Sequence, residues 1–293
     1  MVSACGGSGG GPIPNDGSAA GGQTLEQLWR APGDDVAVVP GTSTYEPGHI
    51  RVSFLVLDAE GRPVIEPTAQ VWVARGLERR PFLETEAKVE RIGVPGGAEA
   101  DSTHIYVARF DVRQPGTYWL LAEPKGGRSE VQALGNVVVH QAIAPPGVGD
   151  RAPASDSPVL AEDGSNAAAI TTRTPPDVTL LRYSVADSLR TRHPFVVVFA
   201  TPKFCTSRMC GPAVDVVEEV AHRHERSSIR FIHVEVYDGN DPARGYNRWM
   251  QEWGLTTEPW TFVVGADGKI SDRFEGPVSV DELDEAVHAV ATG

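Results

Sequence analysis

The sequence predicts a two-domain protein, an all-β domain followed by an α/β domain, and three observations support this. The chain has 293 residues, which is enough for two domains of ordinary size. Residues 34–141 hold short stretches of alternating polar and apolar residues, separated by turn signals. From residue 177 onward, apolar strand-like runs alternate with amphipathic helical stretches. The two halves are therefore expected to belong to different structural classes.

The composition describes globular material and argues against one class of partner. Hydrophobic residues make up 41% of the chain and charged residues 22%, and no apolar run has the length of a membrane helix. The formal net charge is −13, whereas nucleic-acid binding needs clustered Lys and Arg. We therefore expect no nucleic-acid partner, and we also expect no cofactor and no metal.

The segment 1–33 is rich in Gly, Ser, Ala and Pro and is predicted to be a disordered tether. Within it, Cys5 follows Val-Ser-Ala and precedes a Gly/Ser run. This pattern resembles a bacterial lipobox, in which the cysteine carries the lipid. The resemblance implies a lipoprotein of the cell envelope, outside the cytoplasm, where disulfides persist. A plain cysteine in a disordered tail is the alternative.

The strands expected in residues 34–141 favour an antiparallel β-sandwich. Alternation is clearest over 49–57, 69–74 and 103–110, with a turn signal at 58–63. The Asp-Ala-Glu-Gly-Arg-Pro turn and the Pro-Gly-Thr-Tyr approach to a late strand resemble immunoglobulin-like domains of bacterial envelope proteins. That resemblance implies a spacer or partner-docking module. Residues 142–176, rich in Pro, Gly and Ser, are predicted to be a linker.

Alternating helices and strands are predicted for residues 177–293. The continuous apolar run 195–200 indicates a strand buried on both faces. The next stretch, 212–226, has Pro in its first turn and acidic residues near its start, as helices prefer. The remaining expected elements are a helix over 185–191, a strand over 229–236, a helix over 243–253, a hairpin over 260–274 and a last helix over 280–291.

Two cysteines lie between the buried strand and the helix that follows it. Cys205 and Cys210 are five positions apart. On one helix their side chains would point about 140° apart, so they can meet only if Cys205 sits in the preceding loop. A helix N-terminus favours a thiolate, the species that attacks disulfides, and Lys203 and Arg208 would add positive charge. The sequence therefore predicts a reversible disulfide between these cysteines.

Residues 178–293 resemble the thioredoxin-like superfamily. The resemblance rests on the strand–cysteine–helix segment and on residues 254–264, where Pro259 matches the family's cis-proline. It implies a thioredoxin-like fold and thiol–disulfide exchange with another extracytoplasmic protein that carries a disulfide or thiols. It also implies that Phe204, Arg208, Glu258 and Pro259 contact that partner.

The chain departs from the family at the cysteines. Thioredoxins have Cys-x-x-Cys, and this chain has Cys-x-x-x-x-Cys. Either Cys205 takes the attacking position, or Cys210-Gly-Pro overlays Cys-Gly-Pro-Cys with Ala213 in the second cysteine's place. Val198 stands where the family carries a buried carboxylate.

Two other functions remain open at the level of sequence. The first is a redox-inactive binding protein with a structural disulfide. The second is a copper chaperone of the Sco type, which uses a cysteine pair and a distant histidine. His233 has no match to that family's ligand loop, and His222 and His224 lie two apart on a helix and so point away from each other.

Overall fold

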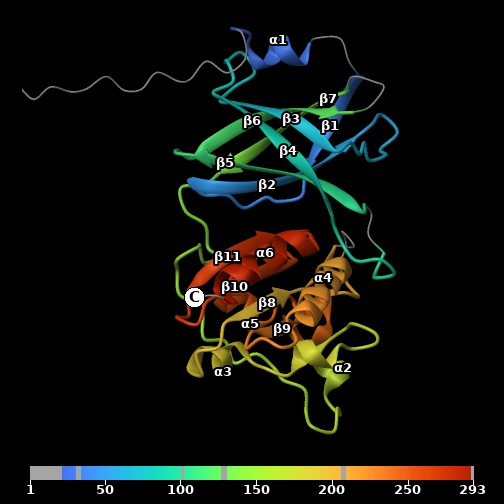
Figure 1. Cartoon of the computed structure of the whole chain (residues 1–293), viewed down its shortest axis with the longest axis vertical. Helices are drawn as coiled ribbons and strands as arrows, with labels where there is room; N and C mark the ends of the chain where they lie inside the picture. Colours follow the sequence, from blue (N-terminus) through green and yellow to red (C-terminus); the bar gives the residue numbers. More distant parts are fainter. Residues whose placement is uncertain (1–21, 31–33, 100–101, 127–130, 206–208, 292–293) are drawn as a thin grey trace, which may run out of the picture.

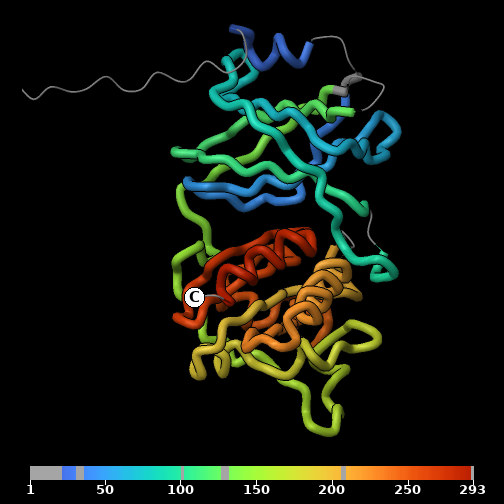
Figure 2. The backbone as a smooth tube through the Cα atoms, in the orientation of Figure 1, coloured from blue at the N-terminus to red at the C-terminus, as the bar shows by residue number. Residues whose placement is uncertain are grey.

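The computed structural model describes residues 22–30, 34–99, 102–126, 131–205 and 209–291. Figure 1 shows two stacked parts, a β-barrel from the first half of the chain and a sheet flanked by helices from the second half. Figure 2 shows the chain passing from the barrel to the second part along one side, after the last barrel strand. Cys5 lies outside the described residues.

Seven strands form a closed barrel in the order β1-β2-β5-β4-β3-β6-β7. Closure depends on β1, which pairs antiparallel with β2 and parallel with β7. Alternate residues of β2, namely Val52, Phe54 and Val56, fill the barrel interior. The strands are β1 (Asp34–Pro40), β2 (Gly48–Leu57), β3 (Thr68–Ala74), β4 (Leu83–Arg91), β5 (His104–Val112), β6 (Gly116–Lys125) and β7 (Val131–Val139).

The second part is a four-stranded sheet in the order β11-β10-β8-β9. β8 runs parallel to β9 and antiparallel to β10, and β10 forms a hairpin with β11. The strands are β8 (Phe195–Phe199), β9 (Arg230–Val234), β10 (Trp260–Val264) and β11 (Ile270–Glu275). The α-helices of the chain are α1 (Leu25–Trp29), α2 (Ala167–Ile170), α3 (Val185–Arg190), α4 (Cys210–Arg223), α5 (Arg248–Glu252) and α6 (Val280–Ala291). The short 3-10 helices are η1 (Val178–Leu181), η2 (Asp238–Asn240) and η3 (Pro242–Arg244).

Both faces of this sheet are covered because β8 is apolar on both sides. Val196 and Val198 pack against α4 and α6. Phe195, Val197 and Phe199 point the other way, into a cluster that includes residues of α3 and α5. Burial of an apolar side chain is worth about 1.5–3 kcal/mol, so β8 anchors the second part and fixes where its C-terminal loop emerges.

The predicted fold class is wrong for both halves. The first half is a barrel, not an immunoglobulin-like sandwich, because β1 pairs with the strands on either side of it and leaves no open edge. No separate strand over residues 34–40 was predicted from the sequence. Closure therefore could not be foreseen from the strands that were predicted.

The second half also differs from the predicted α/β thioredoxin-like fold. The described chain as a whole is mostly β, a seven-stranded barrel plus a four-stranded sheet, and only α4 and α6 among its described helices exceed six residues. The helix predicted over 243–253 is reduced to α5. Gly245 adopts a φ of 76°, which ends η3, and Tyr237 pairs with Tyr246 in a β-bridge.

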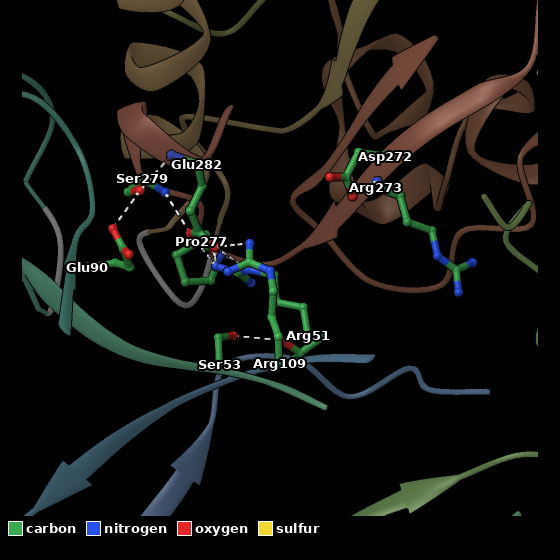
Figure 3. Close-up of polar contacts among 10 residues, drawn as sticks. Arg51, Ser53, Glu90, Arg109, Asp272, Arg273, Pro277, Ser279 and Glu282 are labelled. Carbon is green, nitrogen blue, oxygen red and sulfur yellow. Dashed lines mark hydrogen bonds and ion pairs between the residues drawn. The ribbon is translucent and has the colours of Figure 1, made fainter. Parts of the chain in front are cut away.

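The barrel and the second part are joined through α6. Figure 1 shows α6 lying next to β2, between the barrel and the sheet. Glu282 of α6 receives hydrogen bonds from Arg51 of β2, at 2.8 Å from Nε and from Nη2, and from Nη2 of Arg109 of β5 at 2.6 Å (Figure 3). Ser279, at the start of α6, donates to Glu90 of β4 at 3.0 Å. The two parts therefore share a charged, largely buried interface.

The segment predicted as a linker lies against the second sheet. Ser155 accepts a hydrogen bond from the indole of Trp253, and Thr172 donates to Glu235. These contacts bring residues 167–174 beside the loop that follows β8. Within the described parts of the chain, every helix is too short or too polar to cross a bilayer.

Candidate active site

The loop after β8 brings the chain to the start of α4 in a tight turn. The carbonyl of Thr201 accepts the N–H groups of Phe204, at 3.3 Å, and of Cys205, at 3.2 Å. The N–H of Lys203 donates to the hydroxyl of Thr172 at 3.2 Å. Residues 206–208 lie outside the described residues, and α4 begins at Cys210. Cys205 therefore stands in the loop and Cys210 in the first turn of the helix.

The two cysteines lie together, and both are thiols. Their sulfur atoms are within 4.8 Å of each other. The backbone N–H of Cys210 donates to Sγ of Cys205 at 3.3 Å. Cys205 is half-buried and Cys210 is fully buried. The outer sulfur thus receives an N–H from the helix start, and the inner sulfur is shielded from solvent.

The surroundings separate the two thiols chemically. The hydrogen bond with Cys205 raises the pKa of Cys210 well above its usual range, and burial and the nearby charge of Cys205 act in the same direction. Cys210 is therefore a neutral thiol at rest. The N–H groups at the helix start favour negative charge on the sulfur that they face, and that sulfur belongs to Cys205.

A carboxylate completes the group around the sulfurs. An oxygen of Glu258 lies within 4.8 Å of both Sγ atoms. The hydroxyl of Tyr246 donates to Glu258 at 3.0 Å, and the ring of Tyr237 stacks on Tyr246 with centroids 5.6 Å apart. Burial, and secondarily the charge of Glu258, raise the pKa of Tyr246 above its usual range, so its hydroxyl remains a donor. Tyr246 therefore holds Glu258 beside the thiols.

Pro259 and Phe204 flank this group. The Glu258–Pro259 peptide is cis, as predicted, and Pro259 is buried, with its carbonyl accepting the N–H of Gly276 at 2.8 Å. Phe204 meets Tyr237 edge-on at 6.4 Å, and the ammonium of Lys203 lies 5.2 Å from the Phe204 ring centre. A cavity of about 500 Å³ is lined in part by Lys203 and Phe204. Its lining also includes Thr172, Arg173 and Asn240.

The barrel reaches the start of α4. Met209, the residue before Cys210, packs against Ile92, Ile105 and Val107 of the barrel. The N–H of Ala98 donates to Asp215 of α4 at 2.5 Å, and Asp215 also pairs with Arg173. These contacts fix the helix turn that carries Cys210 from the barrel side.

The structure thus brings together four residues that the sequence singled out: Cys205, Cys210, Glu258 and Pro259. Phe204 lies next to them. Arg208 is outside the described residues, as is Cys5. Sequence reasoning missed the positioning role of Tyr246 and the barrel contact of Met209. No pattern in the sequence pairs Tyr246 with Glu258, or Met209 with residues more than a hundred positions earlier.

The histidine considered for a copper site, His233, is engaged in other contacts. His233 on β9 is buried, and its ring nitrogens lie 3.4 Å from the Thr171 hydroxyl and 3.0 Å from the carbonyl of Ala200. Burial lowers the pKa of His233, which keeps the ring neutral. Beside the cysteines the described residues place a carboxylate, which is a poor match for soft Cu(I).

Comparison with known proteins gives no family. No family model matches the chain, and no curated protein matches it. Among solved structures, the chain is similar to a thioredoxin-family thiol:disulfide interchange protein from Chlorobium tepidum, at 17% identity and a TM-score of 0.34, covering 50% of this chain and 99% of that one. It is also similar to the PKD domain of the human receptor SorCS2, at 14% identity and a TM-score of 0.20, covering 48% and 95%. A third similar structure is the Lin-41 filamin domain, at 12% identity and a TM-score of 0.21, covering 38% and 96%.

Proposed function

We propose that this protein exchanges thiols and disulfides with a partner protein, with Cys205 as the attacking residue and Cys210 as the resolving residue. One observation carries the proposal: two thiols within 4.8 Å differ in burial and in hydrogen bonding in the way that such a pair requires. The attacking sulfur must reach solvent and hold negative charge. Cys205 meets both conditions, and Cys210 meets neither.

The reaction proceeds in two exchanges. The Cys205 thiolate attacks one sulfur of a partner disulfide, a bond forms between them, and the other partner sulfur leaves as a thiolate that takes up a proton. Cys210 then loses its proton and attacks Sγ of Cys205. The Cys205–Cys210 disulfide forms, and the first partner sulfur leaves as a thiolate that is protonated in turn. The partner disulfide is thereby reduced by two electrons and the cysteine pair is oxidised. The same steps in reverse oxidise a partner dithiol.

Glu258 is the group best placed to take the proton from Cys210. A buried thiol with a raised pKa needs a base close at hand, and the Glu258 carboxylate lies within 4.8 Å of its sulfur. Val198 leaves no carboxylate in the strand before the cysteines, and Glu258, just before β10, supplies one instead. We assign Glu258 this role in addition to the partner contact inferred from the family resemblance.

The partner would dock beside Phe204, Lys203 and Pro259. The cavity of about 500 Å³ next to Lys203 and Phe204 lies beside the loop that carries Cys205, and it is large enough for a partner side chain next to the attacked sulfur. The extracytoplasmic location and the lipid anchor at Cys5 are parts of this proposal that rest on the sequence alone.

A trapping experiment tests the order of attack. Cys5 is replaced by Ser in every variant. Turnover is followed as insulin reduction by dithiothreitol. In a separate reaction the reduced variants are mixed with insulin without dithiothreitol, and mixed disulfides are resolved on non-reducing gels. Cys210→Ser should accumulate a mixed disulfide through Cys205, and Cys205→Ser should accumulate none. Both variants should lose at least about 95% of the turnover, because each removes one of the two required exchanges.

Two outcomes would count against the proposal. Equal trapping by both variants would remove the distinction between Cys205 and Cys210, and full turnover in both would remove exchange altogether. The binding-protein alternative is separated by the reduction potential of the Cys205–Cys210 pair. A structural disulfide lies below about −300 mV and a catalytic one lies higher.

A further inference from the structure

A group of metal-ligand side chains lies away from the cysteines, where α4 ends against α6. His224 closes α4, and Asp284 and His288 lie on α6, four positions apart and so on one face of that helix. One ligand atom from each of the three lies within 4.8 Å of the other two. At the level of sequence, His222 and His224 were rejected as a metal-binding pair, and no contact between His224 and the last helix was predicted.

The local geometry holds these groups close to a shared point. Nε2 of His224 lies 2.7 Å from Oδ1 of Asp284, and Nδ1 of His288 lies 3.7 Å from Oδ2 of the same carboxylate. The two imidazole rings meet edge to face with centroids 4.8 Å apart. Ligand atoms around a tetrahedral zinc ion are about 3.3 Å apart, as Zn–N and Zn–O bonds near 2.0 Å require. Zinc binding would therefore require Asp284 and His288 to shift from their present distances to that spacing.

The three side chains differ in how deeply they are buried. The His224 side chain is 10% exposed and the Asp284 side chain 23%, so packing holds both in place. The His288 side chain is 63% exposed, and its Nδ1 lies 2.8 Å from the carbonyl of Asp284. A preformed pair with one adjustable ligand costs less ordering entropy on binding than three mobile side chains.

The charges near the group also bear on a cation. Arg223 lies 3.8 Å from Oδ2 of Asp284, and it would oppose a bound cation. Its stronger contact is with Glu219, at 3.2 Å, and its side chain is 43% exposed, so it can turn away toward solvent. Asp281 lies 3.6 Å from the same guanidinium and adds negative charge.

We propose that His224, Asp284 and His288 form a site for a borderline divalent transition metal such as Zn²⁺, with water in the fourth position. Two imidazoles and one carboxylate form a donor set that suits zinc, whereas Mg²⁺ prefers oxygen ligands and is disfavoured by the two imidazoles. The ion would tie His224, the C-cap of α4, to α6. Because α4 begins at Cys210, the site would steady the helix that carries the resolving thiol, at the end opposite to it.

Zinc titration by calorimetry tests the site without any activity measurement. The full chain is used with Cys5, Cys205 and Cys210 all replaced by Ser, so that thiols cannot contribute. Zn²⁺ should bind at about one ion per chain. His288→Ala should weaken binding at least about tenfold, and Mg²⁺ should not bind. His222→Ala is the matched control, because this exposed histidine lies in the last turn of α4, as His288 lies in the last turn of α6, and is outside the group.

Thermal unfolding supplies the second measurement. Zinc should raise the melting temperature of the parent protein and of His222→Ala, because a ligand that binds only the folded state stabilises it. It should not raise that of His288→Ala, whose exposed side chain can be removed without disturbing the fold. Asp284→Asn should behave like His288→Ala. Equal zinc affinity in His288→Ala and the parent protein, or no saturable zinc binding at all, would overturn the proposal.

Discussion

Replacing Glu282 by Ala should destabilise the protein more than any other single change at the interface between barrel and sheet. The carboxylate is 5% exposed and is bound by Arg51, whose side chain is 11% exposed, and by Arg109, whose side chain is 42% exposed. It also completes a reciprocal cap on α6, in which the N–H of Glu282 donates to the Ser279 hydroxyl at 3.1 Å and the N–H of Ser279 donates to Glu282 at 3.3 Å. One side chain thus serves two structural roles.

The magnitude follows from what the substitution leaves behind. Removing one partner of a buried ion pair costs about 3–5 kcal/mol, because the remaining charge stays buried without compensation. Here that charge is Arg51, one nitrogen of which already lies buried without a hydrogen-bond partner. Arg109 can turn to solvent, so Arg109→Ala should cost at most about 1 kcal/mol. Loss of the reciprocal cap on α6 adds to this cost.

Urea unfolding monitored by tryptophan fluorescence measures the effect. Trp253 and Trp260 report on the second sheet, and Trp72 and Trp119 report on the barrel. Asp281→Ala is the matched control, because its side chain is 90% exposed on the same helix and its loss should change stability by less than about 0.5 kcal/mol. A Glu282→Ala protein within about 1 kcal/mol of the wild type would refute the reasoning about buried charge.

Three further predictions concern the thiol site and the interface. Gly211→Ala should destabilise the protein by about 1–3 kcal/mol, because the added Cβ would lie 2.7 Å from the Cβ of Ala98. With Ala98→Gly present, the same change should stabilise the protein, as Ala normally does in a helix. Urea unfolding of the four proteins would show whether the sign of the effect reverses. Asp272→Asn should stabilise at neutral pH, because burial raises the pKa of Asp272 and makes its charged form costly when folded. This gain should shrink as pH falls through the raised folded pKa and vanish below the ordinary carboxyl pKa, and a gain that is constant in melts from pH 3 to 8 would contradict it. In the protein with both cysteines, Glu258→Gln should slow resolution of the mixed disulfide by about a hundredfold at pH 7 in stopped-flow measurements, a larger factor than any change in its formation. An unchanged resolution rate would remove Glu258 from the mechanism.

The sequence identified the local elements of the site well. The apolar run over 195–200, the cysteine loop and the helix start are each encoded within a few residues, and the structure places β8 at Phe195–Phe199 and α4 at Cys210–Arg223. The cis peptide before Pro259 was also predicted. The strand, the loop and the helix start depend on short-range preferences, which a single sequence carries, whereas the cis peptide was expected from the family resemblance.

The features that the sequence did not reveal depend on contacts between distant segments. Barrel closure requires β1 to pair with β7, about a hundred residues away, and nothing in the composition of either strand signals that pairing. The approach of Glu258 to the two sulfurs and the contact of Met209 with the barrel are of the same kind. The helix expected over 243–253 failed for a local reason, since Gly245 at positive φ ends η3 and the α-helix begins only at Arg248.

The contact between Met209 and the barrel has a practical consequence for how the thiols are studied. A fragment that begins after β7 would lose Ile92, Ile105 and Val107, against which Met209 rests, and Ala98, which binds Asp215. Its first α4 turn would then meet water on a side that is covered in the whole chain, and the reactivity of Cys210 would change with it. Measurements on such a truncated protein would describe a different thiol, so the barrel belongs in every biochemical preparation.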